Sequence, residues 1–221
     1  MLIIFDLDDT LIETSKCLTP YYLKLAFDSM RKAGLEIEED VFDELVSMNQ
    51  NALTSRFALK KFWSKYSDQI KIYDAGLAVM KTPLPEDLPL EIVPGAIEVL
   101  EGLQEAHTLA LVTLGNPHLQ GEKMKKAGIQ PELFSKLVIG KGPSKKLDYQ
   151  TILTELKFDA QEVIVCGDRV PIDLTPAKEL GLFTVHFRHG RGLCHNEPKA
   201  DVDLSIDALK QLHEVFAQHE I

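Results

Sequence analysis

The stretch LIIFDLDDT, residues 2–10, decides the fold. Four apolar residues, Leu2 to Phe5, run directly into three carboxylates, Asp6, Asp8 and Asp9. A short apolar run that ends in polar turn residues is typical of a strand buried on both faces of a parallel sheet. Carboxylates this close repel one another, so either they form a solvated turn or a positively charged group lies among them.

Four further apolar runs follow the same pattern. They cover residues 108–113, 137–139, 163–166 and 183–187, and helix-like stretches separate them. Continuously apolar strands that alternate with helices indicate a parallel sheet with helices on both faces. The predicted fold class is therefore α/β, and the loops that follow the strands gather at one edge of the sheet.

The segment between the first and second strands breaks this pattern, because it contains no convincing strand. Its apolar residues recur with helical spacing instead. It ends in the proline-rich stretch KTPLPEDLPLEIVPG, residues 81–95, which is typical of a domain edge. The sequence thus predicts a core domain formed by residues 1–13 and 92–221, with a helical domain at 14–91 inserted after the first strand.

The composition excludes several kinds of partner. The chain has 221 residues and a net charge of −10, which is a poor match for non-specific binding to nucleic acid or to an anionic membrane. The three cysteines, Cys17, Cys166 and Cys194, form no CxxC pair, and they indicate neither a disulfide framework nor a zinc site. The apolar run at the N-terminus is too short for a membrane span. We expect a cytoplasmic protein with no nucleic-acid or membrane partner.

Asp6 and Asp8 follow the first strand and lie two residues apart. Their side chains therefore point the same way for as long as the chain stays extended. Capping of a helix would explain one of them. A nucleophilic carboxylate with a second carboxylate as proton shuttle would explain both.

Polar residues also follow the second and third strands. Thr113 is either simply the end of its strand or a hydroxyl donor to a bound oxyanion, with the backbone N–H groups of Leu114 and Gly115 nearby. Lys145 and Lys146 precede the next helix, where cations oppose the helix dipole. A lysine aimed at a phosphate would explain that placement.

Asp168 and Asp173 follow the fourth strand, in the stretch VCGDRVPID. Alone, a Gly-Asp turn is common. In an open parallel sheet, however, the carboxyl ends of the strands share one crevice, which would bring these acids to Asp6 and Asp8. Four carboxylates together require a cation. Oxygen ligands at a site that also handles phosphate suit Mg²⁺.

Taken together, these motifs resemble those of the haloacid dehalogenase (HAD) superfamily, in its branch of Mg²⁺-dependent phosphatases. DLDDT at residues 6–10 is similar to the family's DxDxT motif, LVTLGN at 111–116 to its second motif, and VIVCGDRVPID at 163–173 to its fourth. The resemblance covers residues 1–13 and about 92–207. It implies a Rossmann-like three-layer core and, in the inserted segment, a helical cap of the type called C1.

The third motif is less similar, because many family members have Lys-Pro where this chain has Lys145 and Lys146. Tyr149 resembles the aromatic residue that follows the motif's lysine by about one helical turn in other members. That spacing favours Lys145, with Lys146 as the alternative and Lys141 as a more distant one.

The resemblance also implies a role for each of these residues. Asp6 is the nucleophile and Asp8 the acid and base, while Thr113 and Lys145 neutralise the phosphoryl oxygens. Asp173 orients either a metal-bound water or the lysine. The predicted metal ligands are Asp6, the backbone carbonyl of Asp8, Asp168 and Asp173, and the predicted substrate contacts are Thr113, Leu114, Gly115, Lys145 and Lys146.

The predicted function is Mg²⁺-dependent hydrolysis of a small phosphorylated metabolite through a phosphorylated Asp6. Dehalogenases that resemble this fold lack an acid at the position of Asp8, because a halide leaves without a proton. A phosphomutase or phosphotransferase of the same family would use the same residues. A non-catalytic phosphate-binding module is the alternative from another class. The sequence indicates neither the substrate nor the oligomeric state.

Overall fold

The computed structural model describes residues 1–194 and 199–218. The chain divides into two compact units. The core unit comprises Met1–Thr14 and Pro89–Ile221, and the helical unit comprises Ser15–Leu88. Among the described residues, no helix is both long and apolar enough to cross a membrane.

The core unit is built on one parallel sheet of six strands. Apolar, β-branched-rich runs form its central strands, and the order across the sheet is β3-β2-β1-β4-β5-β6. β1 lies in the middle, where Phe5 is in register with Leu111 on one side and Cys166 on the other. The strands are β1 (Leu2–Phe5), β2 (Thr108–Leu114), β3 (Lys136–Gly140), β4 (Val163–Gly167), β5 (Phe183–Phe187) and β6 (Leu204–Ile206).

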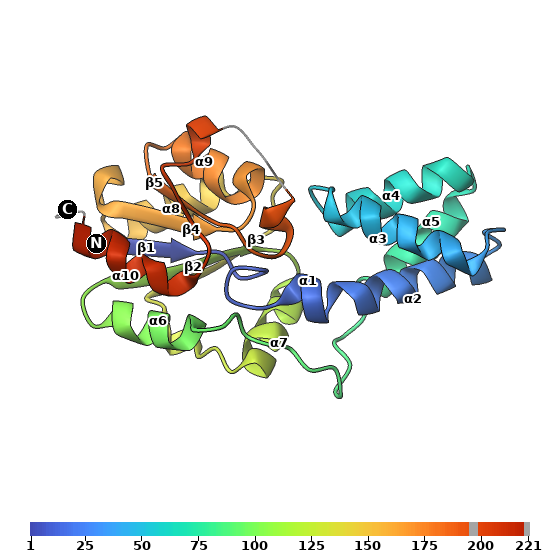
Figure 1. Cartoon of the computed structure of the whole chain (residues 1–221), viewed down its shortest axis with the longest axis horizontal. Helices are drawn as coiled ribbons and strands as arrows, with labels where there is room; N and C mark the ends of the chain where they lie inside the picture. Colours follow the sequence, from blue (N-terminus) through green and yellow to red (C-terminus); the bar gives the residue numbers. More distant parts are fainter. Residues whose placement is uncertain (195–198, 219–221) are drawn as a thin grey trace. The chain divides into compact units, whose positions relative to one another are not determined.

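Helices cover both faces of this sheet (Figure 1). α6 (Ala96–Gln104), α7 (Pro117–Ala127) and α10 (Leu212–Gln218) pack on one face, and α8 (Lys146–Leu156) and α9 (Thr175–Lys178) pack on the other. Side chains of β1 alternate between two apolar clusters, one under each helical layer. The predicted α/β class, with a Rossmann-like three-layer core, is confirmed.

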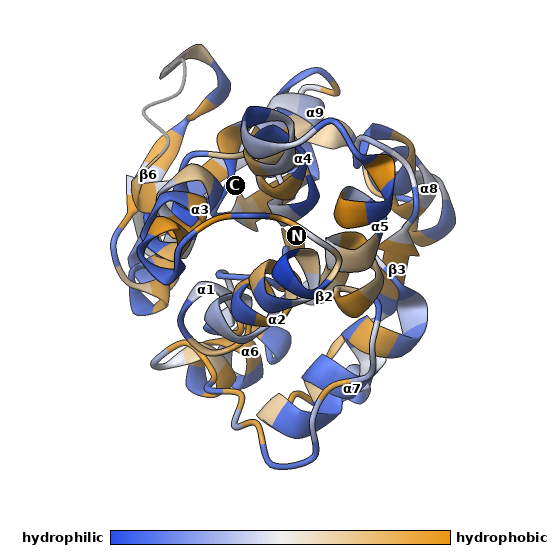
Figure 2. Ribbon diagram, turned by 90° about the vertical axis from the view of Figure 1, so that its right-hand side faces the viewer, coloured by the Kyte–Doolittle hydropathy of each residue, from blue (hydrophilic) through white to orange (hydrophobic). Residues whose placement is uncertain are grey.

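The helical unit contains α2 (Thr19–Lys32), α3 (Phe42–Gln50), α4 (Ser55–Tyr66) and α5 (Ile70–Val79), and the short α1 (Thr14–Cys17) leads into it. Its helices bury an apolar cluster of their own, which includes the rings of Phe27 and Phe62, tilted by 52° to each other. Hydrophobic and hydrophilic residues alternate along the helices of both units, as expected when one helix face lies in a core (Figure 2).

The chain leaves and re-enters the core unit through two adjacent segments. The N–H of Glu13 donates to the carbonyl of Glu91 at 2.9 Å, and the N–H of Val93 donates to the carbonyl of Leu11 at 2.9 Å. These bonds tie the two connections together as a short antiparallel pair. The helical unit is therefore inserted at a single point of the core unit.

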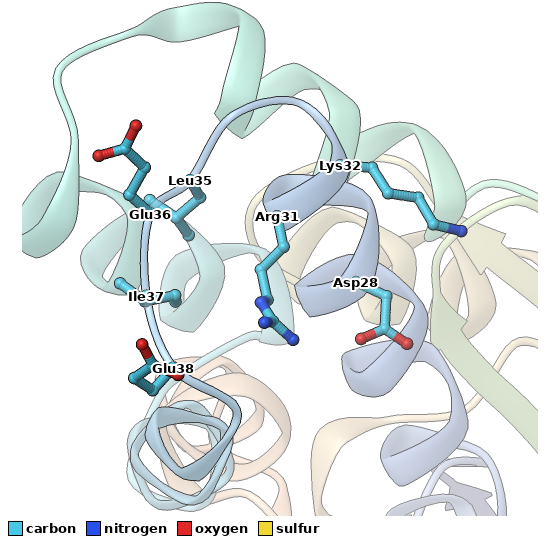
Figure 3. A pocket seen from close by; sticks show the side chains of 7 residues that line it. All are labelled: Asp28, Arg31, Lys32, Leu35, Glu36, Ile37 and Glu38. Carbon is cyan, nitrogen blue, oxygen red and sulfur yellow. The ribbon is translucent and has the colours of Figure 1, made fainter.

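The helical unit also carries a hollow of about 680 Å³ at the end of α2 and the loop that follows it (Figure 3). Side chains of both charges line it, among them Arg31, which pairs with Glu39. None of the residues that the sequence predicts for the site lies in its lining. We therefore look for the functional site at the ends of the strands.

Candidate active site

The turn after β1 separates the three acids of the opening stretch. Asp6 continues the strand for one residue, and its N–H donates to the carbonyl of Cys166 at 3.0 Å. The chain then makes one helical turn, in which the N–H of Leu11 donates to the carbonyl of Leu7. Asp9 takes a left-handed conformation with φ of 61°, is buried, and faces Arg191, whose Nε lies 3.9 Å from its carboxylate.

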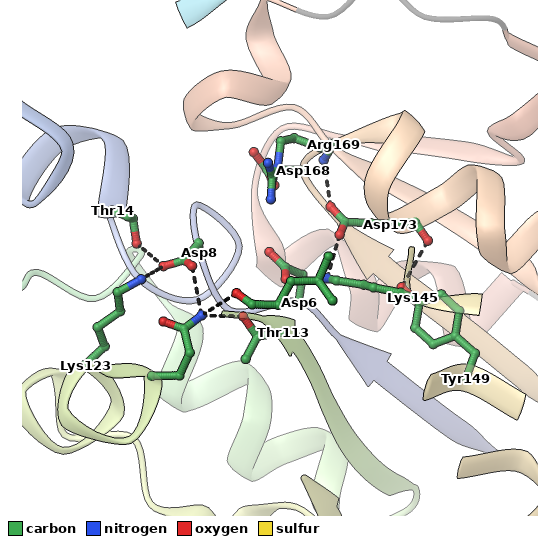
Figure 4. Close-up of polar contacts among 12 residues, drawn as sticks. Asp6, Asp8, Thr14, Thr113, Lys123, Lys145, Tyr149, Asp168, Arg169 and Asp173 are labelled. Carbon is green, nitrogen blue, oxygen red and sulfur yellow. Dashed lines mark hydrogen bonds and ion pairs between the residues drawn. The ribbon is translucent and has the colours of Figure 1, made fainter. Parts of the chain in front are cut away.

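Lys145 joins the end of β1 to the end of β4 (Figure 4). It is fully buried just before α8, and its Nζ lies 2.5 Å from Asp6 Oδ1 and 2.6 Å from Asp173 Oδ1. Tyr149, one turn further along α8, donates its hydroxyl to the backbone carbonyl of Asp173 at 3.0 Å. The half-exposed Lys146 instead pairs with Glu179 at 2.7 Å. The structure thus brings Lys145, and not Lys146, to the carboxylates.

Asp168 and Asp173 are held close together by the turn after β4. A π-helical turn, Val170–Leu174, folds Asp173 back so that its Oδ2 accepts the N–H of Arg169 at 2.9 Å. Gly167 permits this approach, because a Cβ there would lie 2.5 Å from the Cβ of Asp173. Both carboxylate oxygens of Asp173 are therefore already engaged, one by Lys145 and one by this N–H.

Negative charge exceeds positive charge in this cluster. Burial raises the pKa of Asp6 to about 7; the charge of Asp173 adds to that rise, and Lys145 opposes it. Burial likewise raises the pKa of Asp168 well above its usual range, although Arg169 lies beside it. The positive charges in the site are therefore too few to stabilise all of its buried carboxylates in the ionised form.

The carboxylate oxygens of this cluster fit a magnesium ion. Asp6, Asp168 and Asp173 each present an oxygen, and these oxygens lie within 4.8 Å of one another. Among the described residues, Asp6 Oδ2 and both oxygens of Asp168 have no hydrogen-bond donor despite their burial. A hard cation with oxygen ligands would satisfy these atoms. Asp6 and Asp168 are thus better placed as carboxylate ligands than Asp173, whose oxygens are taken.

Asp8 lies in a different environment from Asp6. Its Oδ1 accepts the hydroxyl of Thr14 at 2.6 Å and the ammonium of Lys123 at 2.7 Å, and its Oδ2 accepts Nε2 of Gln120 at 3.1 Å. Burial alone would raise the pKa of Asp8. The Lys123 charge and these hydrogen bonds outweigh burial and hold the pKa well below its usual range.

Thr113 lies at the end of β2, beside these two acids. Its buried Oγ1 is 2.6 Å from Gln120 Nε2, and the carbonyl of Leu114 is 3.3 Å from the same nitrogen. The N–H of Gly115 was predicted to contact the substrate, but it donates to the carbonyl of Gly140 at 3.0 Å. That N–H completes the sheet edge and is not available to a ligand in this structure.

Gln120 and Lys123 were not predicted from the sequence; both come from α7 and both are buried. Helical spacing could have shown that these two positions lie on the buried face of α7. Residues 120, 123, 124 and 127 lie on one face of a helix, and that face packs toward the core. A glutamine and a lysine in those positions are polar residues where apolar ones are expected.

Comparison with known proteins is consistent with this geometry. A model of the haloacid dehalogenase-like hydrolases matches residues 1–181. The chain belongs to this family. It is 32% identical over 202 residues to a glyceraldehyde 3-phosphate phosphatase of Pyrococcus abyssi, which covers 86% of this chain and 82% of the relative. It is 30% identical to the protein of that name in Pyrococcus furiosus, over 97% and 92% of the two chains.

Solved structures agree on the fold of this HAD-like hydrolase. A predicted phosphoglycolate phosphatase from Haemophilus somnus superposes with a TM-score of 0.72 at 18% identity, over 97% of this chain and 96% of the other. The HAD-hydrolase YfnB of Bacillus subtilis, bound to magnesium in its crystal, superposes with a TM-score of 0.66 over 97% of each chain. The chain is thus an enzyme of the hydrolase class, and its curated relatives are phosphatases.

Proposed function

We propose that this HAD-like hydrolase is a Mg²⁺-dependent phosphomonoesterase that acts on a small phosphorylated metabolite through a phosphorylated aspartate. One observation carries the proposal. Asp6 lies at the end of the central strand and one of its oxygens pairs with the buried Lys145. Its other oxygen and both oxygens of the neighbouring Asp168 have no hydrogen-bond donor among the described residues. That arrangement suits a nucleophile held beside a cation site.

The reaction takes place in two steps at Asp6. In the first, a carboxylate oxygen of Asp6 attacks phosphorus, the bond from phosphorus to the ester oxygen breaks, and Asp8 gives a proton to the departing alcohol. In the second, Asp8 takes a proton from a water molecule whose oxygen attacks the phosphorus. The bond to Asp6 then breaks, and inorganic phosphate leaves.

Asp8 must carry a proton for the first step and lack it for the second. The Lys123 pair keeps Asp8 ionised in the ligand-free protein. A phosphate dianion bound nearby opposes that effect, because a second negative charge raises the proton affinity of the carboxylate. Substrate binding therefore raises the proton affinity of Asp8, which is the direction that proton donation to the leaving group requires.

The other residues neutralise the phosphoryl group. Lys145 and the hydroxyl of Thr113 face the oxygens on which most of the transition-state charge resides, and Asp173 fixes the position of Lys145. Mg²⁺, held by the carboxylates of Asp6 and Asp168 and the backbone carbonyl of Asp8, would supply further positive charge at these oxygens.

The names of the relatives support a proposal for the substrate class. Four of the curated proteins that the chain matches are named glyceraldehyde 3-phosphate phosphatase. We propose a three-carbon phosphate of this kind as the substrate, and the helical unit as the cap that selects it. The same residues would serve a phosphomutase, so release of free phosphate is the measurement that decides between the two.

The direct test is phosphate release from glyceraldehyde 3-phosphate, phosphoglycolate, phosphoserine and p-nitrophenyl phosphate, with Mg²⁺ and with excess chelator. We expect release only with Mg²⁺. Asp6→Asn should abolish it, because a neutral amide is a poor nucleophile. The matched control is Asp207→Asn, which removes an exposed surface partner of Arg188. Near-wild-type activity of Asp6→Asn, with deamidation excluded by mass spectrometry, would refute the proposal.

A further inference from the structure

The Asp8 carboxylate is fixed on both of its oxygens. Thr14 and Lys123 hold Oδ1 (Figure 4). Gln120 holds Oδ2. Thr14 follows the turn after β1, whereas the other two donors come from α7, more than a hundred residues further along the chain. A carboxylate held at both oxygens from two elements cannot rotate freely about its χ angles.

Gln120 links Asp8 to Thr113. Its amide nitrogen lies 3.1 Å from Asp8 Oδ2, 2.6 Å from Thr113 Oγ1 and 3.3 Å from the carbonyl of Leu114. A carboxylate and a carbonyl can only accept, which requires the nitrogen of the amide to face them. Thr113 Oγ1 therefore accepts from Gln120, and its own hydroxyl proton remains free to be donated elsewhere.

Burial of the Lys123 ammonium group costs desolvation energy, and the packing of α7 does not require a charged residue at this position. Its side chain is only 8% exposed, and the Asp8 side chain that it contacts is 17% exposed. A methionine of similar length would fill the same space without the desolvation of an ammonium group. The Lys123–Asp8 pair is therefore better explained by what it does to Asp8 than by stability.

We propose that Gln120 and Lys123 are positioning residues. Together they hold the Asp8 carboxylate where it meets the leaving-group oxygen, and Gln120 also directs the Thr113 hydroxyl toward the phosphoryl group. This inference rests on the proposed function and extends it to two residues of α7, spaced Gln-x-x-Lys. Neither residue touches the substrate, and both act through Asp8 or Thr113.

Leaving groups of different basicity test the proposal. The alcohol of glycerol phosphate needs a proton to depart, whereas p-nitrophenolate departs without one. With Mg²⁺ present, Lys123→Met should lower kcat/KM for glycerol phosphate at least about tenfold, a part of the usual contribution of a general acid, because the Asp8 carboxylate is no longer held at the leaving-group oxygen. Loss of the Lys123 charge by itself would raise the pKa of Asp8 and favour proton donation, so a decrease reports the lost positioning. It should change kcat/KM for p-nitrophenyl phosphate only a few-fold. A merely structural role would lower both values equally and would overturn the proposal.

Three further variants sharpen this test. Lys125→Met removes an exposed lysine from the same helix and should change neither kcat/KM. Lys123→Arg retains a cation and should recover part of the loss for glycerol phosphate. Gln120→Leu should lower kcat/KM for both substrates, because it frees Asp8 and also misdirects Thr113, with the larger loss for glycerol phosphate.

A double-mutant cycle keeps the inference separate from the proposed function. Asp8→Asn should lose activity selectively on glycerol phosphate, and equal losses on both substrates would contradict the role of Asp8 itself. If that selectivity is present, Lys123→Met added to Asp8→Asn should cost nothing more, because Lys123 acts through Asp8. If the losses in kcat/KM from the two substitutions multiply, this inference is wrong while the proposed function still stands. The double variant leaves no unpaired carboxylate, so the comparison stands even where Lys123→Met folds poorly.

Discussion

Lys145 is one cation shared by two buried carboxylates. Its ammonium lies 2.5 Å from Asp6 and 2.6 Å from Asp173, and its side chain is 1% exposed. With Lys145 removed, both carboxylates stay buried and unpaired, which is far more costly than losing an exposed pair. The contribution of this lysine to stability is thus inseparable from its place beside the nucleophile.

We therefore expect Lys145→Met to lower the free energy of unfolding by about 3–5 kcal/mol. The neighbouring variant Lys146→Met is the matched control, because it removes only the exposed pair with Glu179 and should cost about 0–1 kcal/mol. Urea unfolding of both variants in the presence of chelator measures the difference. Equal losses would show that Lys145 does not carry the charge balance of the cluster.

The raised pKa values of Asp6 and Asp168 predict how stability depends on pH in the metal-free protein. The unfolded chain loses these protons near the ordinary value of 3.8, whereas folded Asp6 keeps its proton up to about pH 7. The folded state thus binds more protons across this window, and stability falls as pH rises through it. Asp8 has a lowered pKa, so its contribution to the free energy of unfolding is complete above about pH 4 and does not change with pH there.

Unfolding in chelator at pH 5 and pH 8 should show a loss of roughly 2–4 kcal/mol at the higher pH. Addition of Mg²⁺ should reduce this loss, because the cation stabilises the ionised carboxylates. A stability that rises from pH 5 to pH 8 without metal would contradict the charge excess that we infer for the site.

At the scale of elements, the turn after β4 depends on a glycine. A Cβ at Gly167 would lie 2.5 Å from Cβ and 2.8 Å from Cγ of Asp173. The turn would have to move, and with it the carboxylate that holds Lys145.

Gly167→Ala should therefore destabilise the protein by about 1–3 kcal/mol and lower phosphatase activity strongly. Gly121→Ala is the control, since a Cβ there meets no atom within 4 Å and alanine favours the interior of α7. Thermal unfolding and kcat should separate the two variants. Wild-type activity of Gly167→Ala would mean that the turn adapts without disturbing the site.

The ends of the strands could be predicted from the sequence, because each of these strands is a continuous run of apolar residues. The apolar runs before Asp6, Thr113 and Asp168 are unbroken, so the polar residue that follows each one stands out. The lysine before α8 was harder to choose, because one residue of helical rotation decides whether an ammonium points inward. β6, with only three residues, has no comparable run.

The contribution of α7 could not be predicted from motifs. Gln120 and Lys123 reach Asp8 only because the second crossover lays α7 against the turn after β1. That proximity is a property of tertiary structure. Helical spacing could have shown that the two residues are buried, but it could not have named the acid that they contact.

At the scale of the whole molecule, the two units are separate in their cores. Each of the three apolar clusters formed by the described residues lies within one unit. The two connections between the units lie side by side, since Ile12 and Ile92 form an antiparallel bridge. A domain inserted in this way leaves the host sheet continuous, which is why its removal need not interrupt the core.

Replacement of residues 15–88 by a short Gly/Ser linker tests this separation together with the proposed role of the cap. The remaining unit keeps both clusters of its sheet, so we expect it to fold and to show a cooperative unfolding transition. It should still release phosphate from p-nitrophenyl phosphate with Mg²⁺, at a lower rate because water is no longer excluded. It should also lose the discrimination among metabolite phosphates that we expect of the full chain.

The same deletion with Asp6→Asn is the inactive control. Unchanged discrimination would mean that the core unit selects the substrate and that the helical unit serves another purpose.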